Sequence, residues 1–468
     1  MNDILDLFEN EICIQVPTSK VCSKDHRLDP GCFVEDNTII LKNEISFTTL
    51  KKLCESIIEP KLFTRIYCKK EYGVPYISAS EMTEIEPPIN ERYISKELTT
   101  EIEQYIIRRG QILFSAAGSV GNVIVAPDYL DDVAGTSDIL RIVLKENNLG
   151  FIFTYLTSSY GANEIANLAY GAIIKRVRGF QLESLKVPVI EEKAIEEINQ
   201  KIEKALTSRE NSYLLLTQAR QLVIAYNNLP PLDEVQTETL DPDKETELQL
   251  VSTEEFTTDY RLDAYFYNPM AELVVRNIKK FATDFDNLFN VSNKVFYLNR
   301  FKRTFVNEKH GIPYLAGKDI IKIRPNDISY LSESETSNLD DYRLEKEWTL
   351  LTCSGTIGRT CYIWNNYEDW VATHDLIRIV SKGKIDSGYL YAFLSNDYGY
   401  HQIVRHKHGA VIDHITPEQI EEILIPIPEE EKIKKIGDLV RQAYDLRAVA
   451  IRLEDEAQEI LTQALTGK

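Results

Sequence analysis

The chain has 468 residues, of which 43% are hydrophobic, and a formal net charge of −20. This length favours two to four structural units, and the hydrophobic content excludes wholesale disorder. No run of about 18 uncharged apolar residues, no basic N-terminal leader and no regular cysteine pattern occur, which predicts a reduced, cytoplasmic protein without a membrane span or structural zinc.

The first half of the chain mixes β-like runs with helical segments. The runs "QILFSA", "NVIVAP" and "ILRIVL" are separated by turn residues, and "LGFIFTYLTSSYGANEIANL" predicts at least one helix over residues 149–168. After Pro188, residues 189–227 predict a long helix, because apolar residues recur near heptad spacing. These apolar residues are Ile195, Ile198, Ile202, Ala205, Leu216, Ala219 and Val223.

Residues 228–258 predict an acidic surface linker. Ten acidic residues lie between Asn227 and Asp259, against Lys244 alone, and prolines interrupt the stretch. One segment therefore supplies much of the negative charge, and basic surfaces elsewhere in the chain are not excluded.

The second half of the chain repeats the first at an offset of about 234 to 238 residues. "GVPYISASEM" at Gly73 matches "GIPYLAGKDI" at Gly311, and "LFSAAGSVGN" at Leu113 matches "LLTCSGTIGR" at Leu350. "TSDILRIV", "YGAIIKRV" and "VPVIEEKAIEEI" have counterparts in "THDLIRIV", "HGAVIDHI" and "IPIPEEEKIKKI", and "HRLDP" corresponds to "YRLDA". Six matches in the same order indicate an internal duplication.

The duplication predicts an α+β protein with two tandem mixed α/β domains, each followed by a long helix. The boundaries are 1–188 for the first domain, 189–227 for its helix, 259–426 for the second domain and 427–468 for its helix. The second helix carries its own heptad-spaced apolar residues: Ile433, Ile436, Val440, Ala443, Ala450, Ala457 and Ile460. Each stripe needs a partner, so the two helices are expected to pair as an antiparallel coiled coil with pseudo-two-fold symmetry.

No catalytic or metal-binding motif accompanies this architecture. "CSGTIGRT" lacks the lysine of a phosphate loop, and neither a G-x-S-x-G elbow nor an H-E-x-x-H motif occurs. Cys353 and Ser354 are replaced by Ala116 and Ala117 in the first copy. Gly118, Gly121, Gly355 and Gly358 are kept in both copies, which favours a structural turn between two strands.

At these residues the chain resembles the specificity (S) subunits of type I restriction–modification systems, over nearly its whole length. The resemblance rests on "RLDAY" from Arg261, the G-[IV]-P-Y segments, "SGTIG", "HDLIRI", the run from "HGAVID" to "IPIPEEEKI", and the duplicated helices. The second copy fits closely, whereas the first is more diverged, with "RLDPGCF" and "GSVG".

The resemblance implies a non-catalytic DNA-recognition subunit. Each target-recognition domain would read one half of an asymmetric bipartite site in double-stranded DNA, and the helices would set the spacing. Two methyltransferase (M) subunits would dock beside the helices and bind S-adenosylmethionine, with no cofactor on this chain and no membrane partner. Whether restriction (R) subunits join is left open.

Basic residues shared between the copies are the candidate DNA contacts. They lie before the two G-[IV]-P-Y segments and around the "YGAIIKRV" and "HGAVIDHI" runs. The candidates are Lys69, Lys70, Lys175, Arg176, Arg178, Arg300, Lys302, Arg303, Lys309, Arg405, Lys407 and His408.

Three alternatives stay open at this stage. One is a recognition subunit of another DNA modification or defence system built on the same paired domains. A second is a protein-interaction scaffold, which the net charge of −20 favours. The third is an enzyme with Cys353 or Ser354 as its nucleophile.

Overall fold

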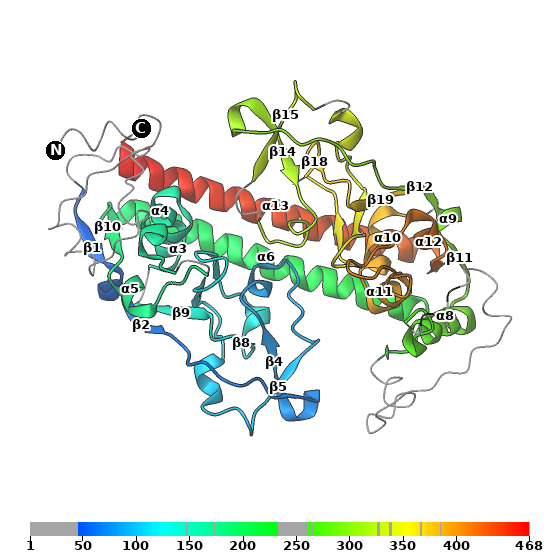
Figure 1. Cartoon of the computed structure of the whole chain (residues 1–468), viewed down its shortest axis with the longest axis horizontal. Helices are drawn as coiled ribbons and strands as arrows, with labels where there is room; N and C mark the ends of the chain where they lie inside the picture. Colours follow the sequence, from blue (N-terminus) through cyan, green and yellow to red (C-terminus); the bar gives the residue numbers. More distant parts are fainter. Residues whose placement is uncertain are drawn as a thin grey trace. The chain divides into compact units, whose positions relative to one another are not determined.

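The computed structural model describes residues 45–145, 148–171, 174–232, 261, 263, 265–324, 328–336, 339–365, 367–383 and 385–467 (Figure 1). These residues form two compact units: described residues up to Thr207 with those from Ala450 onward, and those from Ser208 to Val449. The "HRLDP" segment and the predicted linker from residue 233 onward lie outside the described residues.

The first unit is built mainly from short strands, with helices that follow them. Its elements are β1 (Phe47–Thr49), α2 (Leu50–Leu53), β2 (Cys54–Ile58), β3 (Tyr67–Cys68), β4 (Gly73–Ile77), β5 (Tyr93–Ser95), β6 (Ile112–Ser115), β7 (Val123–Val125), β8 (Ala134–Gly135), β9 (Ile139–Leu144), α3 (Leu149–Thr157), α4 (Ser159–Leu168), α5 (Gly179–Glu183), β10 (Lys186–Pro188) and the first part of α6 (Glu192–Tyr226).

The second unit repeats this order after one additional helix. Its elements are α8 (Pro269–Phe281), β11 (Phe285–Asn287), α9 (Leu288–Val291), β12 (Ser292–Phe296), β13 (Phe305–Val306), β14 (Gly311–Leu315), β15 (Ser329–Ser332), β16 (Thr349–Thr352), β17 (Thr360–Tyr362), β18 (Val371–Ala372), β19 (Leu376–Ser381), α10 (Ser387–Leu394), α11 (Asp397–Val404), α12 (Pro417–Glu421), β20 (Leu424–Pro426) and the first part of α13 (Glu430–Thr466).

The sheets of the two units have the same strand order. One four-stranded sheet, here called the core sheet, runs β2-β9-β6-β7 in the first unit and β12-β19-β16-β17 in the second. Another, the tip sheet, runs β3-β5-β4-β8 and β13-β15-β14-β18, and a strand pair joins β1 to β10 and β11 to β20. A β-bulge occurs at the same place in β2 and β12. The duplication seen in the sequence is therefore a duplication of fold.

A buried arginine on an inner strand of the core sheet reaches the tip-sheet region in each unit. Arg378 on β19 is fully buried and donates to the carbonyl oxygens of Ala372 and Thr373, at 3.2 and 3.3 Å. Arg141 on β9 is also buried and donates to the carbonyl oxygen of Ile106. Burial lowers the pKa of both guanidinium groups to about 10, so both stay charged at neutral pH.

The predicted helix over residues 149–168 is in fact two helices, α3 and α4. Ser158 between them is extended, with φ −70° and ψ 157°, and its hydroxyl accepts a hydrogen bond from the Gly161 backbone nitrogen at 3.0 Å. A serine that caps a new helix in this way competes with continuation of the preceding one. The apolar pattern predicted helix correctly but did not show the break.

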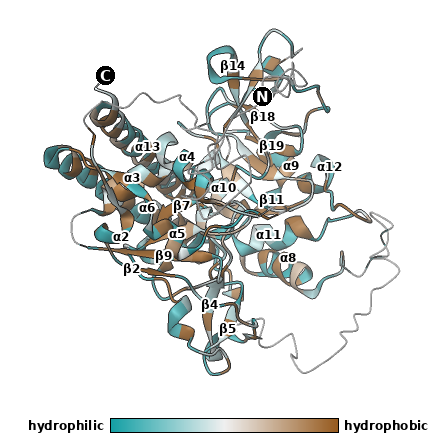
Figure 2. Ribbon diagram, turned by 60° about the vertical axis from the view of Figure 1, so that its left-hand side comes forward, coloured by the Kyte–Doolittle hydropathy of each residue, from teal (hydrophilic) through white to brown (hydrophobic). Residues whose placement is uncertain are grey.

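The two long helices pair within each unit, as the heptad stripes predict. In the first unit, Ile198 and Ile202 of α6 are buried in the same hydrophobic cluster as Ala457 and Leu461 of α13, and Lys201 pairs with Glu456 at 2.7 Å. The beginning of α6 therefore packs against the end of α13. Hydrophobic and hydrophilic residues alternate along both helices (Figure 2).

In the second unit the other parts of the same helices meet. Ala219 and Val223 near the end of α6 share a hydrophobic cluster with Ile436 and Val440 near the beginning of α13. The order is antiparallel in both units, which confirms the predicted pairing. The helices begin at Glu192 and Glu430, three residues after the predicted positions 189 and 427.

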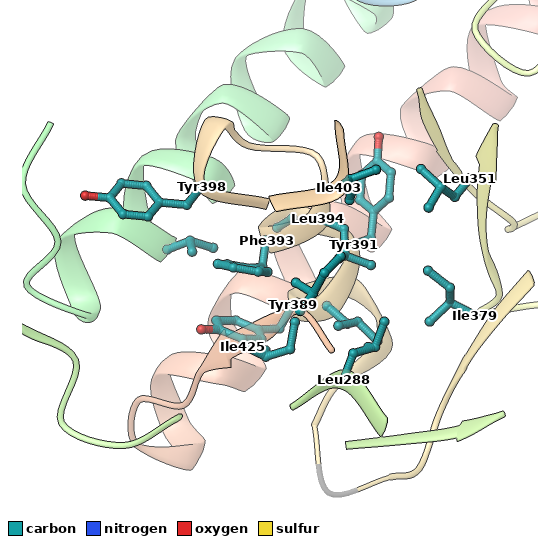
Figure 3. Packing of buried hydrophobic residues seen from close by; sticks show 14 of the residues in the cluster. Leu288, Leu351, Ile379, Tyr389, Tyr391, Phe393, Leu394, Tyr398, Ile403 and Ile425 are labelled. Atoms are coloured by element: carbon teal, nitrogen blue, oxygen red, sulfur yellow. The ribbon is translucent and has the colours of Figure 1, made fainter. Parts of the chain in front are cut away.

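Helix α10 forms the centre of the second unit's core. Figure 3 shows Tyr389, Tyr391 and Phe393 of this helix among aliphatic side chains from α9, β16, β19 and β20. The three aromatic residues are at most 2% exposed. The hydroxyl of Tyr389 donates to the carbonyl oxygen of Pro426 at 2.6 Å, which satisfies its polar group inside the core.

Candidate nucleic-acid interface

The tip sheet of the second unit carries one group of the predicted basic residues. Arg300, Lys302 and Arg303, here called the basic segment 300–303, directly precede β13. Lys309 lies in a short 3-10 helix between β13 and β14. Arg303 is half-buried and the other three are exposed. Figure 1 shows β14 and β15 at the end of this unit opposite α11 and α12.

The tip sheet of the first unit carries Lys69 and Lys70 in the corresponding connection. They lie between β3 and β4, and both are exposed. Tyr72, in the same turn, has 69% of its surface exposed. In each unit, the residues before the G-[IV]-P-Y strand therefore present positive charge, and in the first unit also an aromatic ring, to solvent.

An open depression adjoins the basic residues of the second unit. Val306, Asn307, His310, Ser332 and Ser334 line it, from β13, β15 and the turns beside them. Amide, hydroxyl and imidazole groups of this kind can form hydrogen bonds with phosphates and with base edges.

His374 also lies near the basic segment 300–303, and it was not among the predicted residues. Burial, together with the charges of Arg303 and Arg300, lowers the pKa of His374, while Asp375, 3.2 Å away, acts in the opposite direction. The imidazole is therefore uncharged at neutral pH and can donate or accept a hydrogen bond. The sequence clue was only that "THD" differs from "TSD" at this position.

An arginine lies over a buried tyrosine at the same place in both tip sheets. The Arg303 guanidinium carbon is 5.7 Å from the ring centre of Tyr314, and that of Arg65 is 5.8 Å from the ring centre of Tyr76. Arg65 was not predicted, because it stands alone and belongs to no cluster. The available signal was the Phe-x-Arg pair that "LFTRIY" and "RFKRTF" share.

The second group of predicted basic residues in the first unit, Lys175, Arg176 and Arg178, mostly forms ion pairs within the chain. Arg178 forms an ion pair with Glu59, which raises the pKa of its guanidinium, and Arg176 lies 3.3 Å from Asp138. Lys175 is exposed, with no ion pair to any described residue. The charges of Arg176 and Arg178 therefore stabilise local structure as well as contributing to the surface potential.

The corresponding basic group of the second unit also forms ion pairs within the chain. Arg405 pairs with Glu272 at 2.5 Å, and Lys407 pairs with Asp413 at 2.8 Å. His408 is exposed and forms a backbone bridge with His414. Across the described residues, no hydrogen bond or ion pair connects this group to the basic segment 300–303.

Arg261, the first residue of the "RLDAY" segment, has a structural role. Its guanidinium donates to the carbonyl oxygens of His406 and Lys407, at 2.9 and 2.5 Å, and its Nε donates to Asp263 at 2.8 Å. The side chain is only 12% exposed. This arginine holds the chain after α11 in place rather than facing solvent.

The glycine turns form the corner between two strands of each core sheet. Gly118 and Gly355 have φ of 74° and 73°, and Gly121 and Gly358 have φ of 91° and 92°. Residues with a side chain rarely adopt these angles. Backbone bridges from Ala117 to Arg176 and from Ser354 to His414 connect each turn to the following hairpin. The equivalent geometry in both units assigns the glycines to the fold.

Cys353 has the environment of a core residue. It is 7% exposed, and burial followed by the nearby carboxylate of Asp375 raises the pKa of its thiol to about 12. A thiol with this pKa is protonated at neutral pH and is a poor nucleophile. The arrangement argues against the enzyme alternative.

No cluster of three or more His, Cys, Asp or Glu side chains in the described part of the chain could hold a metal ion.

Among the helices of the described residues, none is both long and apolar enough to cross a membrane.

The chain belongs to the family of type I restriction–modification DNA specificity domains. The family's sequence model, described as "Type I restriction modification DNA specificity domain", matches residues 42–224 and 301–449, one match in each half. The chain is thus a specificity subunit, whose role is DNA sequence recognition rather than catalysis. This assignment decides against the interaction scaffold and the enzyme.

Two solved structures match most of this chain at low similarity. The S subunit of a type I restriction–modification system from M. genitalium is 15% identical, with a TM-score of 0.34, and the match covers 91% of this chain and 98% of that one. The HsdS subunit from Thermoanaerobacter tengcongensis is 14% identical, with a TM-score of 0.28, over 93% and 100% of the two chains. No curated protein sequence matches this chain.

Proposed function

We propose that each unit reads one half of an asymmetric bipartite DNA sequence through its tip sheet and the basic residues before it. The proposal rests on the comparison of the two tip sheets, which share one strand order but expose different side chains. The tip sheets have the same strand order, yet Lys69 and Lys70 correspond to Asn307 and Glu308. The same frame with different polar groups suits two readers of different sequences.

The chemistry of the exposed residues supports contact with DNA. Arg300 and Lys302 have no ion pair with any described residue, so their charges are available to phosphates and guanine edges. Lys309 is exposed in the same region. The predicted residues with acidic partners, Arg178 and Arg405, are the weaker candidates.

The long helices are proposed as the spacer and the docking site for two methyltransferase subunits. At 1.5 Å per residue, the 35 residues of α6 extend about 52 Å, more than the roughly 34 Å of one turn of DNA. The methyltransferase subunits would bind S-adenosylmethionine and supply much of the phosphate contact, because this chain has a net charge of −20. The cytoplasm would be the location of this assembly, and it stays open whether restriction subunits join it.

Exchange of one recognition region tests the two-reader proposal. Residues 259–425 would be replaced by the same region of a family member with a known target, and the chimera expressed with its methyltransferase. Methylome sequencing should show one half of the methylated motif changed and the other half kept. A change in both halves, or in neither, would contradict the proposal.

A further inference from the structure

Resting on the proposed function, we infer that Arg65 and Arg303 are equivalent phosphate anchors, one in each unit, and that the sequence-reading residues are the non-equivalent ones around them. No sequence motif or family resemblance assigned a role to Arg65. The inference comes from the comparison of the two tip sheets.

The surroundings of the two arginines are matched in detail. Phe63, two residues before Arg65, lies 4.1 Å from Tyr105 between ring centres, and Phe301, two residues before Arg303, lies 4.1 Å from Tyr342. The hydroxyl of Tyr105 donates to the Lys61 carbonyl oxygen, and that of Tyr342 donates to the Asn299 carbonyl oxygen. The segment before each arginine is therefore fixed by the same pair of contacts.

The tyrosines under the arginines are equally matched. Tyr76 and Tyr314 are 1% and 6% exposed, and the ring of each lies near an aromatic ring of the edge strand of its tip sheet, Tyr67 of β3 at 6.3 Å or Phe305 of β13 at 6.0 Å. A buried ring restricts the guanidinium above it to one region of the surface and so lowers the entropy lost on binding a ligand. Each arginine is therefore biased toward one region of the surface before DNA binds.

The charges of both arginines remain unneutralised by the described residues. Neither Arg65 nor Arg303 has an ion pair with a described carboxylate, whereas Arg92, which also lies over Tyr76 at 5.7 Å, pairs with Glu81. A held but uncompensated guanidinium at the surface is suited to an anion, and it can bind phosphate in a bidentate manner.

The presence of an equivalent arginine in both units favours a phosphate, rather than a base, as its ligand. Two units that read different half-sites do not need the same base-reading residue, whereas the phosphate backbone is the same at every sequence. Around the shared arginines the residues differ: Leu62 and Thr64 in the first unit correspond to Arg300 and Lys302 in the second. Shared residues would then position the DNA, and unshared ones would read it.

The test uses the purified complex of this chain with its methyltransferase subunits. Binding is measured to a duplex with the methylated bipartite motif and to one without it, from 50 to 200 mM salt. Arg65→Ala and Arg303→Ala should each weaken both complexes by a similar factor and leave their ratio unchanged. Loss of one phosphate contact lowers the salt slope by about 0.9, so this salt increase should weaken each variant roughly 3.5-fold less than the wild type.

Three controls make the outcome specific. Arg303→Lys should retain the salt slope, because the charge remains. Arg276→Ala removes an exposed charge from α8 and should leave the slope unchanged. Lys302→Ala should change the preference between half-site variants.

An alanine variant that lost affinity only for the motif duplex would show base reading and overturn the inference, as would an unchanged slope. Failure of the wild-type complex to distinguish the duplexes would instead refute the proposed function.

Discussion

His406 makes the second unit sensitive to acid, and His406→Leu should remove that sensitivity. The side chain is 4% exposed, its ring lies against Phe266 at 5.7 Å, and its Nδ1 has no hydrogen-bond partner among the described residues. Burial, followed by the charges of Arg405 and Arg261, lowers the pKa of His406 to about 3. The equivalent residue of the first unit is Leu168, so leucine is compatible with this position of the fold.

The size of the effect follows from the difference between the two pKa values. The unfolded chain binds a proton at His406 below about pH 6.5, whereas the folded chain does so only below about pH 3. Protonation therefore favours the unfolded state between these values, and stability is complete above pH 6.5 and falls as the pH decreases. Between pH 7.5 and 5.5 the free energy of unfolding decreases by about 1.4 kcal/mol. Because pH 5.5 lies well above the pKa of about 3 in the folded chain, the pKa of the unfolded chain determines the size of this decrease.

Urea unfolding followed by tryptophan fluorescence measures this loss in the relevant unit. The three tryptophans, Trp348, Trp364 and Trp370, all lie in the second unit. Other acid-sensitive groups, such as His401 with its lowered pKa, are present in both proteins, so the wild type should lose about 1.4 kcal/mol more than His406→Leu. Equal losses in the two proteins would show that His406 is not held neutral by burial.

Two further substitutions test the packing of the second unit. Alanine normally stabilises a helix by about 1 kcal/mol over glycine, but a methyl group at Gly437 of α13 would overlap the Asp386 carboxylate, which binds Arg441 at 2.9 and 3.0 Å. Gly437→Ala should therefore lower the free energy of unfolding by about 1–3 kcal/mol in the same assay, with Gln442→Ala as control; a gain would refute the contact. Cys353→Ala should leave DNA binding unchanged, since its thiol is protonated, and a loss of recognition in a protein with wild-type stability would refute its assignment to the core.

The long helices and the twofold repetition of the fold could be predicted from the sequence, since both depend on regular spacing. Ile198 and Ile436 occupy heptad positions and are fully buried in the structure. The repeated glycines likewise identified a turn, because positive φ angles restrict the residue type. Patterns of this sort record local geometry, which the chain expresses within a few residues.

The partners of the basic residues could not be predicted, because they lie far away in the chain. Arg178 meets Glu59, 119 residues earlier, and Arg405 meets Glu272, 133 residues earlier. A cluster of positive charge looks the same in sequence whether its charges face solvent or a carboxylate. Arg65 was missed for the opposite reason, because its importance comes from the ring below it rather than from neighbouring charges.

Comparison of the two units shows which arginines occur in both, and burial then distinguishes those that the fold requires from those that a ligand would require. Arg141 and Arg378 are shared and buried, and both donate to backbone carbonyl oxygens, so the fold accounts for them. Arg65 and Arg303 are shared but reach the surface without a described acidic partner, so the fold alone does not account for their charge. A charge retained at the surface of two units that are proposed to read different sequences is explained by what all DNA has in common, its phosphate backbone.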